Sequence, residues 1–175
     1  MTGWGGVPTF RVSAAAAVQT DLVAPPPFPL VSVPGLRIAR VGMERFNTVQ
    51  DLNVRVFGDE RVIQRLDRPH LLFLLAEAEG GPIAFKVGYG ESTTTFYSAK
   101  GGVLDTYRRS GIARAMLHRM MDEARALGYS RFAYDTFPNK HPGMTVLGLA
   151  EGFTVTASGY NAAYRDIRIR FEKEL

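Results

Sequence analysis

The chain contains no cysteine. This excludes disulfides, thiolate metal sites and a cysteine nucleophile, and it is compatible with a reducing cytoplasm, where we expect the protein to be. No run of 18 apolar residues exists and no basic stretch leads into an apolar one near residue 1, so we expect neither a membrane span nor a secretory signal. No Gly-Lys-Ser/Thr triplet points to a Walker-type nucleotide site. Histidines and carboxylates show no metal-ligand spacing, so no metal is expected.

Positive charge is in small excess: the chain has 21 lysines and arginines and 17 aspartates and glutamates, which gives a net charge of +4. This mild surplus suits an anionic ligand such as a nucleotide, and it also permits weak nucleic-acid affinity. No predicted helix has a dense basic face, so we expect no nucleic-acid partner. Apolar residues make up 46% of the 175 residues, which is enough for one domain with a substantial core.

The first 35 residues differ in composition from the rest. They are rich in glycine, alanine and proline, and the run Pro25–Pro29 favours an extended arm, because proline fixes φ and removes a hydrogen-bond donor. The arm carries Trp4, Phe10 and Phe28, which would pack on the domain or on a neighbouring subunit, so a homodimer contact is plausible. We therefore divide the chain into an arm, residues 1–35, and a domain, residues 36–175.

Hydrophobic periodicity predicts the order of elements in the domain. The nearly continuous apolar run of residues 70–78 is typical of a buried central strand, and the helix after residue 112 has an apolar face. Thr48 and Asp51 look like a capping-box variant at the start of one helix, and Asp59 caps a second. We predict strands at residues 36–41, 70–78, 82–89, 96–103, 131–137, 153–157 and 164–171, and helices at 48–58, 59–66, 112–127 and 144–151. Hairpins combined with an αβ crossover imply a mixed sheet.

The segment from residue 103 to 114 joins a predicted strand to this amphipathic helix. It carries Arg108, Arg109, Ser110 and Gly111. The start of a helix has backbone N–H groups without intrahelical partners and a partial positive charge. Glycine lets a ligand approach the backbone closely, and arginine offers a fork suited to phosphate oxygens. The segment therefore predicts an anion site, above all for phosphate.

The pattern Arg108-x-x-Gly111-x-Ala113 resembles the pyrophosphate-binding motif of the GNAT superfamily of N-acetyltransferases, Gln/Arg-x-x-Gly-x-Gly/Ala. Asn139, the pair Gly152-Phe153 and the last five residues are also similar to that family. The resemblance covers residues 36–175. It implies an α+β fold, with a central mixed, mostly antiparallel sheet of six to seven strands flanked by about four helices.

The resemblance also implies acetyl-coenzyme A as the cofactor and an amine of a small molecule or peptide as the acceptor. The strand end Gly102-Val103-Leu104 would offer backbone groups to the pantetheine arm, and Asn139 would contact the pantetheine or the coenzyme's bound tail. The pyrophosphate would lie against Arg108, Arg109, Ser110, Gly111, Ile112, Ala113 and Arg114. The thioester would lie where the strands before and after the motif helix separate.

Acyl transfer to an amine needs a base that takes a proton, a donor for the oxyanion and an acid for the departing thiolate. A backbone N–H of the 96–103 strand suits the oxyanion. Many GNAT enzymes carry the acid as a tyrosine four residues before the Gly-Phe pair, where this chain has Gly148. The candidate bases are Glu91 and Asp135, and the candidate acids are Tyr134, His141 and Tyr160; we select Glu91, Tyr134 and His141.

Three functions compete at this point. An N-acetyltransferase, acting by direct attack in a ternary complex, explains the motif and its flanks. A catalytically weak acyl-CoA-binding or sensing module of the same fold would explain the missing tyrosine at Gly148. A nucleic-acid-binding protein rests only on the basic charge and ranks last, because it predicts steeply salt-dependent nucleic-acid binding without a basic helix to provide it.

Overall fold

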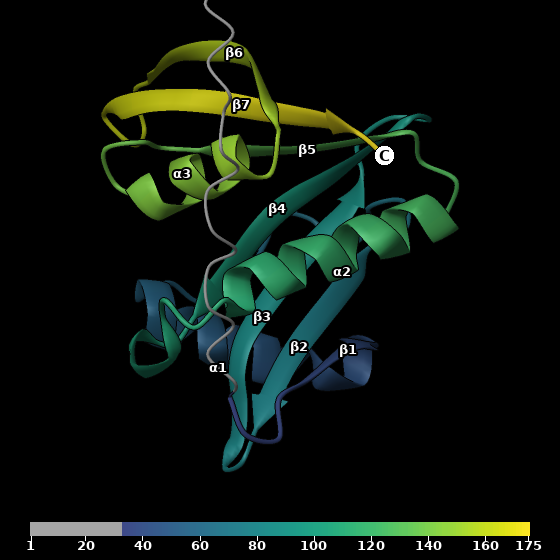
Figure 1. The fold of residues 1–175 in the computed structure, drawn as a ribbon, viewed down its shortest axis with the longest axis vertical. Coiled ribbons are helices and arrows are strands. Elements are labelled where there is room, and N and C mark those ends of the chain that lie inside the picture. Colours follow the sequence, from purple (N-terminus) through teal and green to yellow (C-terminus); the bar gives the residue numbers. More distant parts are fainter. Residues whose placement is uncertain (1–32) are drawn as a thin grey trace, which may run out of the picture.

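The computed structural model describes residues 33–175, which form one seven-stranded sheet with three α-helices (Figure 1). The predicted arm, residues 1–35, lies almost wholly outside the described residues, as does the homodimer contact expected from it. Within residues 33–175, no helix is long and apolar enough to cross a membrane.

The sheet is mixed and mostly antiparallel, as predicted. Its strand order is β1-β2-β3-β4-β5-β7-β6, and β4 with β5 is the parallel pair. The other neighbours pair antiparallel. The strands are β1 (Arg37–Val41), β2 (Leu72–Ala78), β3 (Gly81–Gly90), β4 (Thr95–Val103), β5 (Arg131–Thr136), β6 (Thr154–Asn161) and β7 (Asp166–Glu174). The crossover between the parallel strands contains the predicted motif helix.

Helices cover both faces of the sheet. Figure 1 shows α2 (Ile112–Ala126) in front of the sheet and α1 (Phe46–Phe57) behind it; α3 (Pro142–Ala150) lies on the same side as α2. We call the two sides the α2 face and the α1 face. The apolar stripe predicted for α2 is buried, and it packs on alternate residues of the strands. A second buried cluster contains Val49 and Leu52 of α1 together with residues of β2 and β3, and it joins α1 to the sheet.

The predicted start of α1 was wrong. The helix begins at Phe46, directly after a 3-10 turn at Met43–Arg45, and its N-cap is Arg45 without a side-chain capping bond. Thr48 lies inside the first turn, where its hydroxyl accepts a hydrogen bond from Arg45 Nε at 3.4 Å. The predicted end was confirmed, because Gly58 caps the helix in the left-handed conformation.

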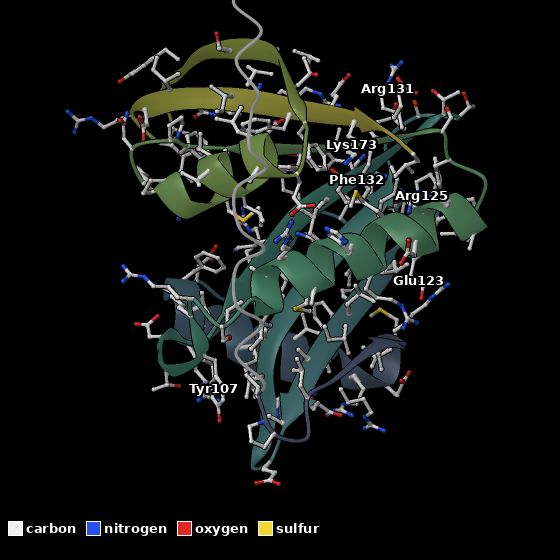
Figure 2. All side chains as sticks on the ribbon, viewed as in Figure 1. Tyr107, Glu123, Arg125, Arg131, Phe132 and Lys173 are labelled. Atoms are coloured by element: carbon white, nitrogen blue, oxygen red, sulfur yellow. The ribbon has the colours of Figure 1, made fainter. Side chains whose placement is uncertain are left out.

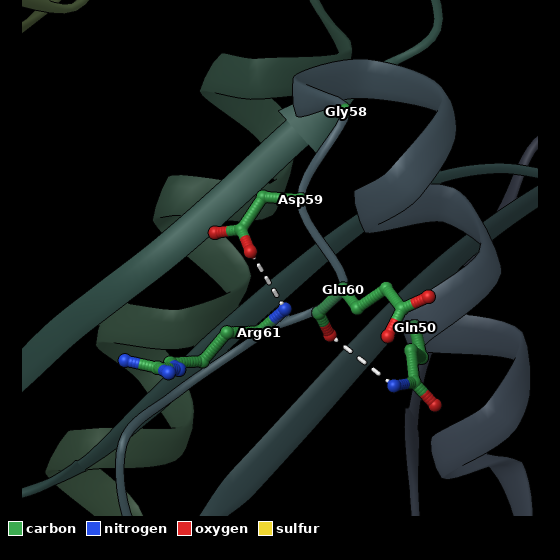
Figure 3. Close-up of a pocket in the computed structure, with 5 residues that line it drawn as sticks. All are labelled: Gln50, Gly58, Asp59, Glu60 and Arg61. Carbon is green, nitrogen blue, oxygen red and sulfur yellow. Dashed lines mark hydrogen bonds between the residues drawn. The ribbon is translucent and has the colours of Figure 1, made fainter.

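The helix predicted for residues 59–66 was also wrong, and the described residues contain three α-helices rather than about four. Side chains from other segments donate hydrogen bonds to backbone carbonyls that would accept backbone N–H groups in a helix. Asn53 donates to the carbonyl of Asp59, Gln50 to that of Glu60 at 3.2 Å, and Lys100 to that of Arg61 at 2.7 Å. The Asp59 carboxylate accepts the Arg61 N–H at 2.9 Å instead of capping a helix. A hollow of about 580 Å³ is lined by Gln50, Gly58, Asp59, Glu60 and Arg61, which Figure 3 shows.

Candidate active site

The parallel strands β4 and β5 separate halfway along their length. Their pairing runs from Thr95 opposite Arg131 to Ser98 opposite Tyr134, while β4 continues to Val103. The register of β3 against β4 skips Ala99, so a bulge lies at the point of separation. Figure 1 shows β4 and β5 diverging from there, with the start of α2 and the whole of α3 on either side. The opening is thus built by a parallel pair that stops early.

The loop between β4 and α2 presents backbone N–H groups to one end of this opening. Arg109 and Gly111 have φ values of 61° and 80°, both left-handed. Gly111 is the N-cap of α2 and forms no side-chain capping bond. Alternating left-handed residues at a helix start turn successive N–H groups toward one point, which suits an anion. Tyr107 marks the loop in Figure 2.

Several predicted cofactor residues have partners in this structure. Arg108 pairs with Asp105 at 2.8 Å, and its Nε lies 3.3 Å from the carbonyl of Val103. Ser110 Oγ donates to the carbonyl of Tyr107 at 2.5 Å and so stabilises the loop itself. An exposed ion pair such as that of Arg108 is worth little and can exchange for a phosphate.

The remaining residues of the motif divide between backbone and side-chain roles. The Ile112 side chain is buried in the core, so only its backbone faces the loop, and Ala113 is exposed. Arg114 forms an ion pair with Glu151, which caps the end of α3. Arg114 therefore links α2 to α3 beside the opening.

The end of β4 has a packing role that the sequence did not reveal. A Cβ on Gly102 would lie 2.7 Å from Val56 Cγ1, so the glycine allows α1 to approach the sheet. Leu104 N donates to the carbonyl of Ile83 at 3.0 Å, and the Val103 carbonyl faces Arg108. Gly102 is thus explained by helix packing, whatever else its backbone binds.

The loop after β5 brings two other predicted residues near the opening. Asn139 Nδ2 donates to Asp166 Oδ1 at 2.7 Å, which ties this loop to the start of β7. His141 is the N-cap of α3, and its ring meets Phe57 edge-on at 6.2 Å. Burial, followed by the charges of Lys140 and Arg108, lowers the pKa of His141, so its imidazole is neutral at pH 7.

Glu91 lies at the closed end of the β4–β5 pair. Its backbone N–H donates to the carbonyl of Thr95, which is three residues before the last β4 residue that pairs with β5. Both oxygens of its carboxylate contact the guanidinium of Arg170. At about 3.3 Å per residue, that position is roughly 10 Å along the strand from the point of separation. The backbone of Glu91 therefore lies away from the opening, while its carboxylate shares the Arg170 guanidinium with Asp135.

Asp135, the other candidate base, is the first β5 residue beyond the last β4 pair. Tyr134 belongs to the core on the α2 face, so Asp135 points to the α1 face. There its carboxylate lies 3.6 Å from both Arg168 and Arg170. Burial raises the pKa of Asp135, and the two arginines oppose this rise. Burial and the nearby carboxylate also raise the pKa of Tyr97.

Tyr134 fills the place left by the missing tyrosine. A Cβ on Gly148 would collide with the Tyr134 hydroxyl, which donates to the Met144 carbonyl at 3.0 Å. The phenol thus reaches α3 from the sheet instead of from α3 itself. Burial raises the pKa of Tyr134.

Lys86, on β3, is a buried charge that sequence reasoning missed. Its neighbours Phe85 and Val87 pack with α1, so Lys86 points to the α2 face. Its Cγ lies 3.2 Å from where a Cβ of Gly101 would be, so the side chain leans over β4. It forms no hydrogen bond or ion pair with another residue of the described range, and burial lowers its pKa to about 8. A lysine inside an otherwise apolar strand was the available signal.

Comparisons with known proteins agree with this arrangement. The family model of the acetyltransferase (GNAT) family matches residues 43–144, more than half of the chain. No curated protein matches the chain at a significant level.

Solved structures share the fold at low sequence identity. An IAA acetyltransferase from Bacillus cereus has a TM-score of 0.70 and 19% identity, over 81% of this chain and 100% of that chain. A GNAT family acetyltransferase from Elizabethkingia anophelis with acetyl-CoA bound has a TM-score of 0.68 and 18% identity, over 81% and 99%. The ribosomal-protein-S18-alanine N-acetyltransferase from Escherichia coli has a TM-score of 0.67 and 15% identity, over 79% and 93%.

Proposed function

Because this chain belongs to the GNAT acetyltransferase family, we propose that it transfers the acetyl group of acetyl-CoA to the nitrogen of a small-molecule or peptide amine by direct attack in a ternary complex. The observation that carries the proposal is the early separation of β4 and β5 beside the uncapped start of α2. A cytoplasmic location is part of the proposal.

The residues at the opening fit the coenzyme. The left-handed Arg109 and Gly111 direct N–H groups toward one point, and Arg108 can exchange Asp105 for a phosphate. These groups would hold the pyrophosphate, and the backbone of the β4 end would hold the pantetheine arm. When bound, acetyl-CoA supplies the activated acetyl thioester. The N–H groups at the Ala99 bulge, on the edge of β4 that has lost β5, suit a developing oxyanion.

Asp135 is the better-placed proton acceptor of the two candidate carboxylates. It borders the opening, and burial raises its pKa toward the range useful to a base near neutral pH. The Glu91 carboxylate has both oxygens on Arg170 and is therefore the more fully paired of the two. In the proposed reaction, the acceptor nitrogen gives its proton to Asp135 as it becomes an amide.

Tyr134 is the proposed proton donor, and it lies on the α2 face, whereas Asp135 lies on the α1 face. It is the phenol nearest to position 148, and its raised pKa keeps it protonated. His141 is neutral and lies beside Phe57 and the coenzyme loop, so its proposed role is to line the entrance. The missing tyrosine therefore does not require an inactive module.

A matched pair of substitutions tests the reaction and the base together. Thiol release from acetyl-CoA is followed over a panel of small amines and peptides. Asp135→Asn should lower kcat by roughly 10²–10⁴-fold, the usual contribution of a general base. Glu91→Gln makes the same chemical change at a residue that reaches Asp135 only through Arg170, so it should lower kcat much less than Asp135→Asn. A larger loss in Glu91→Gln would move the base to that residue, and coenzyme binding without turnover of any amine would refute the transferase.

A further inference from the structure

A small cavity adjoins the opening on the α1 face. It measures about 170 Å³ and is lined by β5, β6 and β7. Its β6 wall consists of the small residues Ala157, Ser158 and Gly159 followed by Tyr160 and Asn161. Asp135 lies on its β5 side, next to the separated strands. An acceptor bound here therefore has its reacting group beside the thioester position.

Two charged groups of this cavity, Asp135 and Arg168, are joined by a long ion-pair contact. The Asp135 carboxylate lies 3.6 Å from each arginine, beyond hydrogen-bond distance. Its Oδ1 is buried, so the oxygen on the side of Arg168 is Oδ2. Arg168 is about half exposed, and its ion pair within residues 33–175 is the long contact with Asp135.

Arg170 differs from Arg168 because it is already neutralised. Its guanidinium contacts Glu91, and its Nε donates to Glu172 at 2.7 Å. The charged groups through which the cavity can meet a ligand are therefore Asp135 Oδ2 and the guanidinium of Arg168. A ligand that satisfies both must carry a cation and an anion a few ångströms apart.

From this pair we infer that the acceptor is a free α-amino acid, an inference that rests on the proposed function. Its ammonium complements Asp135, and its carboxylate complements the fork of Arg168. The cavity volume equals the liquid share of roughly six water molecules, at about 30 Å³ each, which suits a single amino acid rather than a long peptide or a polyamine.

The charges also account for turnover. The acceptor nitrogen, after losing one proton to solvent, forms a bond to the acetyl carbon and gives its second proton to Asp135. The C–S bond of the thioester breaks, and the sulfur leaves as a thiolate that Tyr134 protonates. The product amide is neutral, so its nitrogen no longer attracts Asp135, and the product is released more readily than the substrate is held.

Matched acceptors test the inference with saturating acetyl-CoA. Alanine is compared with ethylamine, which lacks the carboxylate, and with alaninamide, in which a neutral amide replaces the carboxylate. Serine is compared with ethanolamine in the same way. We expect kcat/KM to be at least about tenfold higher for the amino acids, consistent with a charged hydrogen bond.

Arg168→Gln then identifies the group that reads the carboxylate. It should lower kcat/KM for the amino acid about 10- to 100-fold more than kcat/KM for ethylamine, because both acceptors share any effect on Asp135 but only the amino acid loses a carboxylate contact; Arg168→Lys should restore part of the loss. Arg131→Gln is the control, because Arg131 is a similarly exposed arginine at the far end of β5 (Figure 2). Calorimetric titration of amino acid into the coenzyme-free protein supplies a readout independent of turnover.

The outcomes separate the two proposals. Equal turnover of amines, amides and amino acids would overturn the amino-acid acceptor and leave the transferase in place. Turnover of peptides above free amino acids would overturn it as well. Amino-acid binding that depends on Arg168, without turnover of any acceptor, would support the binding site and refute the transferase.

Discussion

Removing the charge of Lys86 should stabilise the protein. The side chain is buried without a partner in the described residues, and its pKa falls from 10.5 to about 8. At 1.36 kcal/mol for each pKa unit, this corresponds to a cost of about 3 kcal/mol for the folded state at pH 7. Lys86→Met keeps an unbranched chain of similar length and removes the charge. The variant should therefore gain up to about 3 kcal/mol in its free energy of unfolding.

The pH dependence gives the prediction a sign. Below pH 8, both the folded and the unfolded protein hold the proton of Lys86, and the full cost is present. Between pH 8 and 10.5, the folded protein has lost that proton and the unfolded chain keeps it, so stability rises with pH. The wild type should gain about 2 kcal/mol between pH 7 and 9.5 relative to Lys86→Met, in which this contribution is absent.

Urea unfolding at pH 7 and pH 9.5 measures both effects, with the slope m as a check that the unfolded states are comparable. Groups other than Lys86 titrate equally in both proteins, so the difference between them isolates the lysine. The reasoning fails if the two proteins change in parallel with pH, or if Lys86→Met is the less stable at pH 7. Either result would mean that the ammonium is solvated or paired in solution.

Two glycine substitutions make further predictions. Gly111→Ala and Gly128→Ala each place a side chain at positive φ, at opposite ends of α2, and should each cost about 1–2 kcal/mol of stability. Only Gly111→Ala should weaken acetyl-CoA binding, by about tenfold or more in calorimetry. Equal affinity in both variants would remove the loop from the coenzyme site. Gly102→Ala should lower the free energy of unfolding by about 1–3 kcal/mol, because its Cβ would lie 2.7 Å from Val56 Cγ1. Gly101→Ala should cost less, because its nearest contacts, Lys86 Cγ and the Phe85 carbonyl oxygen, are both at 3.2 Å. Equal losses in urea unfolding would contradict this packing argument.

Local patterns predicted much of the fold. The stripe Ile112, Met116, Met120 and Ala124 is visible at four-residue spacing, and all four side chains are buried under α2. Strand alternation and glycine-marked turns gave the sheet, because these signals lie within a few residues of each other. The proposed anion site also rests on a local pattern, the glycine directly before the helix.

Long-range contacts explain what the sequence left undecided. The helix expected at residues 59–66 failed because Lys100, some 40 residues away, takes a carbonyl there. Asp135 and Arg170 meet through the register of β5 and β7, which no local pattern sets. The alternation of Arg168 with Arg170 was visible in the last strand, but the face to which they point depends on the assembled sheet.

The contact between Tyr134 and Gly148 has an evolutionary consequence. The two positions share the volume of one phenol, because a side chain at 148 would occupy the space of the Tyr134 hydroxyl. In this packing, a tyrosine at position 148 would need a smaller or displaced side chain at position 134, so replacements at the two positions are coupled. Within such a family, the phenol can move from helix to strand while neither position appears conserved on its own.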